Sequence, residues 1–159
     1  MTHSEIAGDI QIIYDASHTL GLIAGGRFQD PLAEGADILQ ENTHKTFYGP
    51  QKGIILGNSM ELMDKISYRL SDGLVSSQHT AETLSLFIAL HEMVKYGSQY
   101  SKTVIDNAQY FARCLHEHGF KILASQQGFT KNHMFYVDIT ELGDGPFIIE
   151  KLLAANISV

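Results

Sequence analysis

The chain has 159 residues, of which 44% are hydrophobic and 18% charged, which is enough apolar material for one ordinary folded domain. The 11 Lys and Arg residues stand against 18 Asp and Glu residues, and the net charge of -7 excludes a basic surface for nucleic acid or an anionic membrane. No apolar run approaches the about 20 residues that span a bilayer, and the N-terminus has no signal-peptide pattern. We therefore expect a cytoplasmic protein, and the single cysteine, Cys114, fits a reducing compartment.

The first third of the chain contains short apolar runs that are typical of strands. Residues 10–14 and 36–40 are almost continuously apolar, which predicts two buried strands of a parallel sheet. The residues between them are enough for a crossover with a short helix. A turn at residues 48–50 precedes a third run at 53–57, which predicts a further strand.

The middle of the chain is predicted to contain three helices. Asn58 or Ser59 can cap a helix that runs to about Tyr68, and Thr80 can cap a second one. The second helix has apolar residues on both sides, so we expect it to be buried nearly all round. One of its apolar stripes consists of Leu84, Phe87, Ile88, His91 and Val94. A third helix is predicted over residues 98–118.

The C-terminal part of the chain changes to a period of two. Residues 120–124 and 133–139 are predicted strands, and Asp144 can cap a last helix with Pro146 in its first turn. Residues 157–159 read as the opening of another strand. A domain rarely ends on the first residues of a strand, so we expect a part of a longer protein.

Polar residues follow two of the predicted parallel strands. Asp15 ends the first strand, and the segment Thr43-His44-Lys45-Thr46 lies beyond the second. Open α/β sheets bind ligands at the carboxyl ends of their strands. A lysine and an acid in these places suit pyridoxal phosphate, because the amine forms a Schiff base with the cofactor aldehyde and the acid pairs with the pyridinium nitrogen. A solvated pair of loop residues has the same spacing, so spacing alone leaves both interpretations open.

Cys114, His116 and His118 are the other group of potential ligands. Residues two apart do not share a face of a helix, so no metal site is predicted. The two histidines are better explained as cations at the C-terminal end of a helix that stops at Gly119.

The sequence around Asp15 and Lys45 resembles the serine (glycine) hydroxymethyltransferase family, which belongs to the fold-type-I pyridoxal phosphate enzymes. The matching motifs, in family order and at near-family spacing, are Asp15-Ala16-Ser17-His18, the segment Leu20–Gly26, Thr43-His44-Lys45-Thr46 and Gly49-Pro50. Weaker similarity continues through residues 132–138 and 155–159. The resemblance therefore covers nearly the whole chain.

The resemblance implies an α/β fold in two parts. Residues 1–118 would form the C-terminal half of a fold-type-I, aspartate aminotransferase-like large domain with a mostly parallel sheet. Residues 119–159 would begin an α+β small domain. Because 159 residues are less than half of a typical family chain, the resemblance implies a partial chain. It also implies a homodimer or other homo-oligomer for the full-length protein.

The resemblance assigns roles to five residues. Lys45 would be the Schiff-base lysine and Asp15 the partner of the pyridine nitrogen. His18 would lie near the phenolic oxygen of the cofactor, and His44 would orient the lysine segment. Thr43 either assists the phosphate and the Schiff base or caps its loop. Lys45, His18, His44 and Thr43 are thus the catalytic candidates.

Three segments depart from the family pattern. Glu41-Asn42-Thr43 stands in place of a run of threonines, so proton transfer near the lysine is expected to differ. Gln51-Lys52-Gly53 replaces Arg-Gly-Gly, which removes a guanidinium fork. Gln78-His79-Thr80 replaces a Gly-Gly-Pro turn that reaches a phosphate in the neighbouring subunit.

The implied activity is an aldol-type transfer at the α carbon of glycine or serine in one-carbon metabolism, with tetrahydrofolate as co-substrate and a small amino acid as substrate. The departures leave two alternatives open: a threonine aldolase or transaldolase that works without folate, and a non-catalytic module that keeps the fold. None of the three arginines matches the arginine with which the family holds a substrate carboxylate. These arginines are Arg27, Arg69 and Arg113. The isolated chain is therefore expected to have little or no activity.

Overall fold

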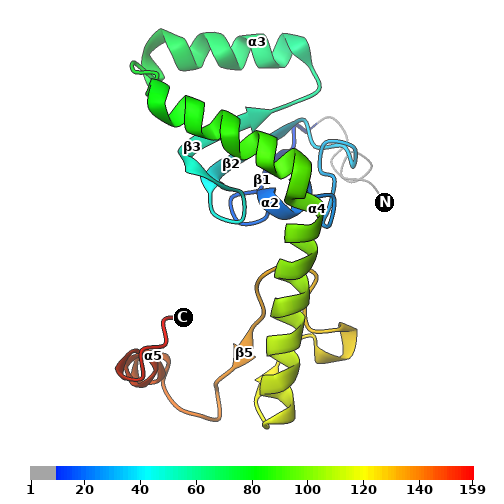
Figure 1. Ribbon diagram of the computed structural model, residues 1–159, viewed down its shortest axis with the longest axis vertical. Coiled ribbons are helices and arrows are strands. Elements are labelled where there is room, and N and C mark those ends of the chain that lie inside the picture. The colour runs from blue at the N-terminus through cyan, green and yellow to red at the C-terminus, as the bar shows by residue number, and fades with distance from the viewer. Residues whose placement is uncertain (1–9) are drawn as a thin grey trace. The chain divides into compact units, whose positions relative to one another are not determined.

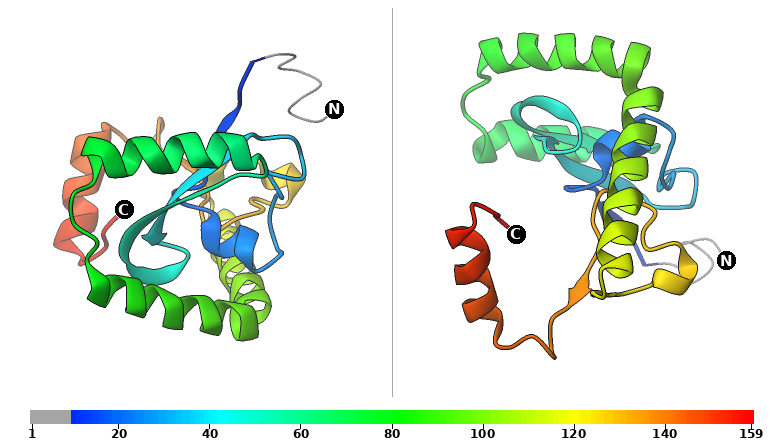
Figure 2. Two further views of the ribbon diagram at one scale, coloured as in Figure 1. Left: turned by 90° about the horizontal axis from the view of Figure 1, so that it is seen from above. Right: turned by 60° about the horizontal axis from the view of Figure 1, so that its bottom comes forward.

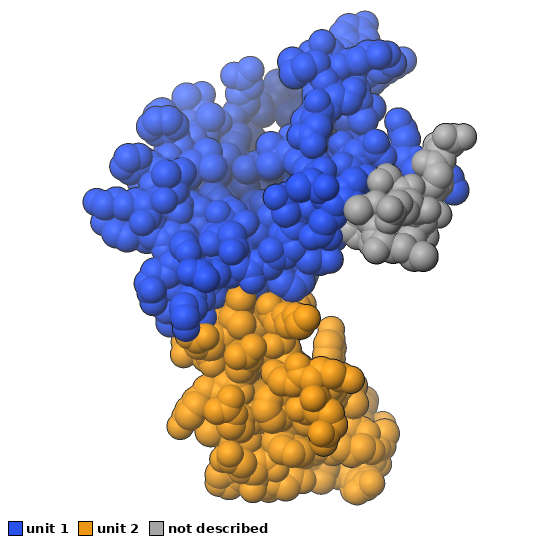
Figure 3. All heavy atoms as spheres, turned by 90° about the vertical axis from the view of Figure 1, so that its right-hand side faces the viewer, with its two compact units in different colours: residues 1–103 blue, residues 104–159 orange. Residues whose placement is uncertain are grey.

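The computed structural model describes residues 10–159. The described residues fall into two compact units, the first ending at Thr103 and the second spanning Val104–Val159 (Figure 3). The first nine residues of the predicted 1–118 domain lie outside the described part. The division between large and small domain at residues 118 and 119 stays a prediction. In the described part, no helix is both long and apolar enough to cross a membrane.

The first unit contains a three-stranded sheet in the order β1-β2-β3 (Figure 1). β1 (Ile13–Asp15) and β2 (Ile38–His44) are parallel, as predicted. β3 (Tyr48–Leu56) is antiparallel to β2. A connection as short as residues 45–47 can only turn back, because parallel strands need a crossover of about a dozen residues. The described sheet is therefore mixed, and residues 48–50, predicted as a turn, belong to β3.

The short helix α2 (Leu20–Ala24) lies in the crossover between β1 and β2, as expected. The core of this unit is a cluster of buried side chains from β2, α2, the segments next to them and helix α4 (Thr80–Glu117): Ala16, Leu20, Leu39, Phe47, Ala89 and Met93. β1 itself is less buried than predicted, since Ile13 is 60% exposed. Its predicted burial is wrong for the described residues, because only one face of this strand meets the core.

Helix α3 (Met60–Arg69) begins where its capping residue predicts. The Ser59 hydroxyl accepts a hydrogen bond of 3.3 Å from the backbone N–H of Leu62. Figure 2 shows α3 and the start of α4 (Thr80–Glu117) on opposite sides of the β2–β3 hairpin.

The prediction of two helices in the region of α4 is wrong, because α4 is continuous from Thr80 to Glu117. Gly97, in the interval between the two predicted helices, is buried inside the helix and lies against Gly25, whose Cα would be 3.6 Å from an added Cβ. The buried stripe of α4 in this unit is Ala89, Met93, Gly97 and Ser101. A stripe with so many small residues lets the backbones approach closely, so Gly97 serves packing and does not end the helix.

The expected burial of the second predicted helix nearly all round is also wrong. Leu84, Phe87, Ile88 and Val94 are between 61% and 89% exposed. The buried stripe of α4 faces the sheet and α2. These four side chains lie on the other side of the helix, where no described residue of the first unit covers them.

The second unit contains β4 (Lys121–Ile122), β5 (Val137–Asp138) and helix α5 (Gly145–Ala154). The strands are antiparallel but shorter than predicted, since Ala124 adopts a left-handed conformation with φ of 55° and ends β4. Asp144 occupies the position before α5 and proline lies in its first turn, as predicted, but the Asp144 side chain makes no capping hydrogen bond. Residues 157–159, predicted to open a strand, form none, because no described strand pairs with them.

Candidate active site

The structure brings Lys45 and His18 together. Lys45 lies in the tight connection between β2 and β3, and His18 lies in the turn after β1. The Lys45 Nζ atom is 3.3 Å from the His18 Nε2 atom, and both side chains are exposed. An amine beside an imidazole nitrogen can be oriented by it while it remains open to a ligand.

Asp15 supplies a carboxylate at the end of β1. Its Oδ1 atom accepts a hydrogen bond of 2.9 Å from the backbone N–H of Ser17. Hydrogen bonds from the Ser17 side chain and backbone lower the pKa of Asp15, and this outweighs the opposing effect of desolvation. Gln40 and the charge of Lys45 lower the pKa further. Asp15 is therefore ionised at neutral pH and suited to pair with a protonated ring nitrogen.

Thr46 holds the two segments that carry Lys45 and His18. Its buried hydroxyl donates to the carbonyl oxygen of His18 at 2.8 Å and accepts from the backbone N–H of Gly21 at 3.1 Å. Gly21 leaves room for this contact, since a Cβ there would overlap the Thr46 carbonyl group. The side chain of Thr46 thus bonds to backbone groups, as a loop-capping side chain does. A glycine within a predicted helix was the signal for the close approach of Gly21.

Thr43 and His44 have surroundings that differ from those of Lys45. The Thr43 hydroxyl is buried in the β2–β3 hairpin, where it donates to the carbonyl oxygen of Pro50 and accepts from the backbone N–H of Lys52 at 3.2 Å. The His44 side chain is exposed, opposite Tyr48 and next to an irregularity in the strand register. The catalytic roles of these two residues stay predictions.

Glu41 is a buried carboxyl group near the same end of β2. Its side chain is 6% exposed, and neither carboxylate oxygen has a hydrogen bond of normal geometry. Burial raises the pKa of Glu41 to about 7, while the Asn42 backbone N–H and the positive charge of Lys45 act against this and Asp15 adds to it. The sequence pointed to Glu41 only as a departure from the threonine run.

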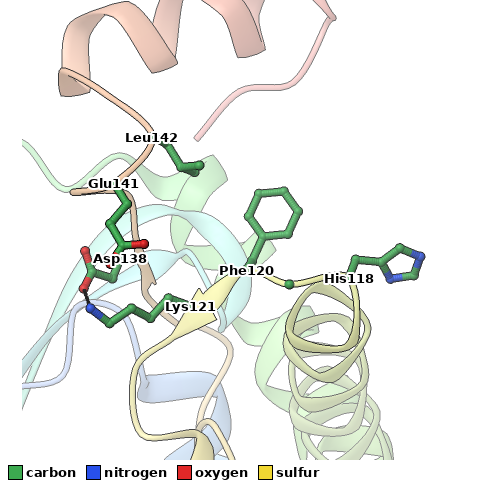
Figure 4. A pocket seen from close by; sticks show the side chains of 7 residues that line it. His118, Phe120, Lys121, Asp138, Glu141 and Leu142 are labelled. Atoms are coloured by element: carbon green, nitrogen blue, oxygen red, sulfur yellow. Dashed lines mark ion pairs between the residues drawn. The ribbon is translucent and has the colours of Figure 1, made fainter.

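Two surface hollows differ in their relation to these residues. One of about 280 Å³ lies in the first unit and is lined by Ser17, Gln40, Glu41, Asn42 and residues 53–55. The other, of about 200 Å³, lies in the second unit and is crossed by an ion pair of 2.7 Å between Lys121 and Asp138 (Figure 4). It contains none of the predicted site residues.

Among residues 10–159, no three His, Cys, Asp or Glu side chains are grouped so that they could hold a metal ion.

Residues 3–159 match the family model of serine hydroxymethyltransferase, and the chain belongs to this family. Its α/β fold is that of the fold-type-I class, as a solved structure also indicates. The crystal structure of L-threonine transaldolase from Pseudomonas fluorescens in the internal aldimine state matches it with a TM-score of 0.87 and 35% identity, over 95% of this chain and 35% of that one.

Two of the curated proteins that are similar to this chain have different activities. The chain is 61% identical over 153 residues to the fluorothreonine transaldolase of Streptantibioticus cattleyicolor, which covers 96% of this chain and 24% of that protein. It is 48% identical over 147 residues to the serine hydroxymethyltransferase of Methanothermobacter marburgensis, which covers 92% of this chain and 34% of that protein. The chain thus spans about a quarter to a third of the length of these relatives.

Proposed function

We propose that this chain carries the lysine, the histidine and the acid of a pyridoxal phosphate site. The enzyme would make or break a carbon–carbon bond at the α carbon of an amino acid. The observation that carries the proposal is the exposed Lys45 amine, 3.3 Å from His18 Nε2 and next to a strand end that bears the ionised Asp15. These residues fit the cofactor, because it needs an accessible amine and an anion. When bound, it supplies a ring that accepts electrons from the substrate.

Each residue has a separate task in this proposal. Lys45 would hold the cofactor through its exposed amine, which lies 3.3 Å from His18 Nε2 and is accessible to a ligand. Asp15 would hold a proton on the ring nitrogen, since its lowered pKa keeps the carboxylate charged. His18 orients the Lys45 amine through its Nε2 atom, and Thr46 keeps both backbone segments in place.

For the reaction, we favour transfer of the threonine transaldolase type without folate. The 61% identity to a fluorothreonine transaldolase supports this choice, as does Gln51-Lys52-Gly53 in place of the family's Arg-Gly-Gly. Hydroxymethyl transfer between serine and glycine with tetrahydrofolate is the second candidate, which the 48% identity to a serine hydroxymethyltransferase supports. In both cases the full-length protein would act on a small amino acid as a cytoplasmic homodimer or homo-oligomer. A non-catalytic module with the same fold is the competing hypothesis.

The cofactor proposal is tested by adding pyridoxal phosphate to the chain and recording its visible absorbance. We expect a new band in the wild type and in Lys131→Ala, which removes an exposed lysine, but no such band in Lys45→Ala. Borohydride reduction followed by peptide mass spectrometry should find the cofactor on Lys45. Identical spectra of the wild type and Lys45→Ala would reject cofactor binding at Lys45 and leave the non-catalytic module.

The choice between the two reactions needs the full-length protein that contains these residues. A transaldolase should exchange the aldehyde part of threonine for another aldehyde without folate. A hydroxymethyltransferase should cleave serine only when tetrahydrofolate is present. Folate-dependent serine cleavage without threonine exchange would reject the first choice in favour of the second.

A further inference from the structure

Glu41 lies on β2, the strand that precedes Lys45, and the proposed mechanism does not use its carboxyl group. It is paired with Ile54 of β3, and its carboxyl group is buried without a hydrogen bond of normal geometry to either oxygen. A buried carboxylate without partners is costly, and the usual response of such a group is to keep its proton. Lys45 follows Glu41 by four positions in the chain, and its positive charge acts to lower the pKa of Glu41.

We propose that Glu41 is a positioning residue for Lys45: its carboxyl group, buried without a hydrogen bond of normal geometry beside the hollow in the first unit, exchanges one proton with solvent and so changes the charge near the Lys45 amine. With the proton on, the interior of the sheet is uncharged at this point. With the proton released to solvent, the carboxylate favours a positively charged nitrogen on Lys45. For its effect on the cofactor, the inference rests on the proposed function.

The groups around Glu41 favour such a proton exchange. Lys45 acts to ionise it, whereas Asp15, which is already charged, acts to keep it protonated. The facing residue of β3, Ile54, is apolar, and the remaining side chains around the neighbouring hollow are uncharged: Ser17, Gln40, Asn42 and Ile55. The two charged neighbours thus oppose each other, and burial decides the balance in favour of the proton.

The direction of the pKa agrees with this geometry. Burial brings the pKa of Glu41 to about 7, where a small change in the charge of Lys45 changes the fraction that is ionised. The threonine found at this place in the family has no proton to lose in this range. An effect of this proton on Lys45 would therefore occur only in this chain and in relatives that share Glu41.

The test follows the side-chain carboxyl of Glu41 by carbon NMR across a pH series, in the 159-residue chain without cofactor. Its signal is identified by its absence in Glu41→Gln, or in Glu41→Thr if the glutamine variant does not fold. We expect a midpoint near neutral pH, and an upward shift by roughly 0.3 to 1 pH unit in Lys45→Met, because a nearby positive charge is lost. Lys131→Met is the control and should leave the midpoint unchanged.

A second readout follows the Lys45 amine itself. Competitive acetylation with mass spectrometry should show Lys45 reacting roughly threefold faster at pH 8 in Glu41→Gln than in the wild type, because the carboxylate no longer favours the unreactive ammonium form. Glu150→Gln, which changes an exposed carboxyl group on α5, should have no such effect.

Two results would overturn the role of Glu41: a midpoint in the range of ordinary exposed carboxylates, or a midpoint that is the same with and without the Lys45 amine. Both are measured without cofactor, so they are distinct from a failure of the cofactor to attach to Lys45. In the loaded chain, the pH at which the visible band changes should differ between the wild type and Glu41→Gln.

Discussion

Replacement of Gly21 by alanine tests whether the contact between α2 and the lysine segment positions the site. An added Cβ would lie 2.7 Å from the Phe47 backbone nitrogen and closer still to the Thr46 carbonyl group, whereas ordinary contact begins at 3.4 Å. The obstructing atoms are backbone atoms in a tight hairpin connection and cannot rotate away. Helix α2 therefore has to move by roughly 1 Å, and the hydrogen bonds of the Thr46 hydroxyl to His18 and Gly21 have to lengthen or break.

The expected cost follows from these contacts. Overpacking of a tight interior costs about 1 to 3 kcal/mol, and each lost hydrogen bond about 1 kcal/mol. Alanine recovers about 1 kcal/mol as the better helix former. We therefore expect the free energy of unfolding of Gly21→Ala to fall by about 2 to 4 kcal/mol, with weaker attachment of pyridoxal phosphate to Lys45.

Urea unfolding followed by circular dichroism measures the loss of stability, and borohydride trapping measures attachment at Lys45. Gly145→Ala is the matched control, since nothing lies within 4 Å of a Cβ at that position of α5. It should leave the attachment at Lys45 unchanged and should not lower the free energy of unfolding. If Gly21→Ala unfolds within about 0.5 kcal/mol of the control and binds the cofactor equally well, the contact has no positioning role.

Three further predictions concern the first unit. The pKa of Glu41 is about 7 when folded against 4.5 for an ordinary glutamate, so the folded state binds this proton more tightly. The stability of the wild type relative to Glu41→Gln should thus fall by about 3 kcal/mol as the pH rises from about 4.5 to above 7, and urea titrations at several pH values measure it. Ser101→Ala removes a buried hydrogen bond of 2.8 Å to the Gly21 carbonyl and should cost about 1 kcal/mol in the same assay, whereas no loss would reject that contact. Phe87→Ser, at a side chain that is 70% exposed, should change the stability by less than about 0.5 kcal/mol, and a larger loss would mean that this face of α4 is covered.

Much of the candidate site could be predicted because its residues follow strand ends. Asp15 and Lys45 were found from their places after two parallel strands, and the motifs around them led to the family that the comparison confirms. The sequence did not reveal that Thr43 bonds within the hairpin whereas Thr46 bonds across to α2. Neighbouring threonines look alike in sequence, and their partners depend on how the backbone turns between them.

The sequence by itself determined the features that depend on a few neighbouring residues. Ser59 caps the start of α3, Pro146 lies in the first turn of α5, and the short link after His44 forces β3 to run back along β2. The length of the link between β2 and β3 is enough to predict that the two strands are antiparallel, although the sequence analysis did not predict the direction of β3.

Only the tertiary structure decided which side of α4 is buried and which atoms meet Lys45. In the described part of the chain, many apolar residues of α4 stay exposed. The buried side is the stripe with Gly97 and Ser101, because small side chains allow the closest approach to α2. Likewise, the 3.3 Å between Lys45 Nζ and His18 Nε2 and the burial of Glu41 depend on how segments distant in sequence pack together. No local preference contains that information, since it arises from contacts made across the sheet.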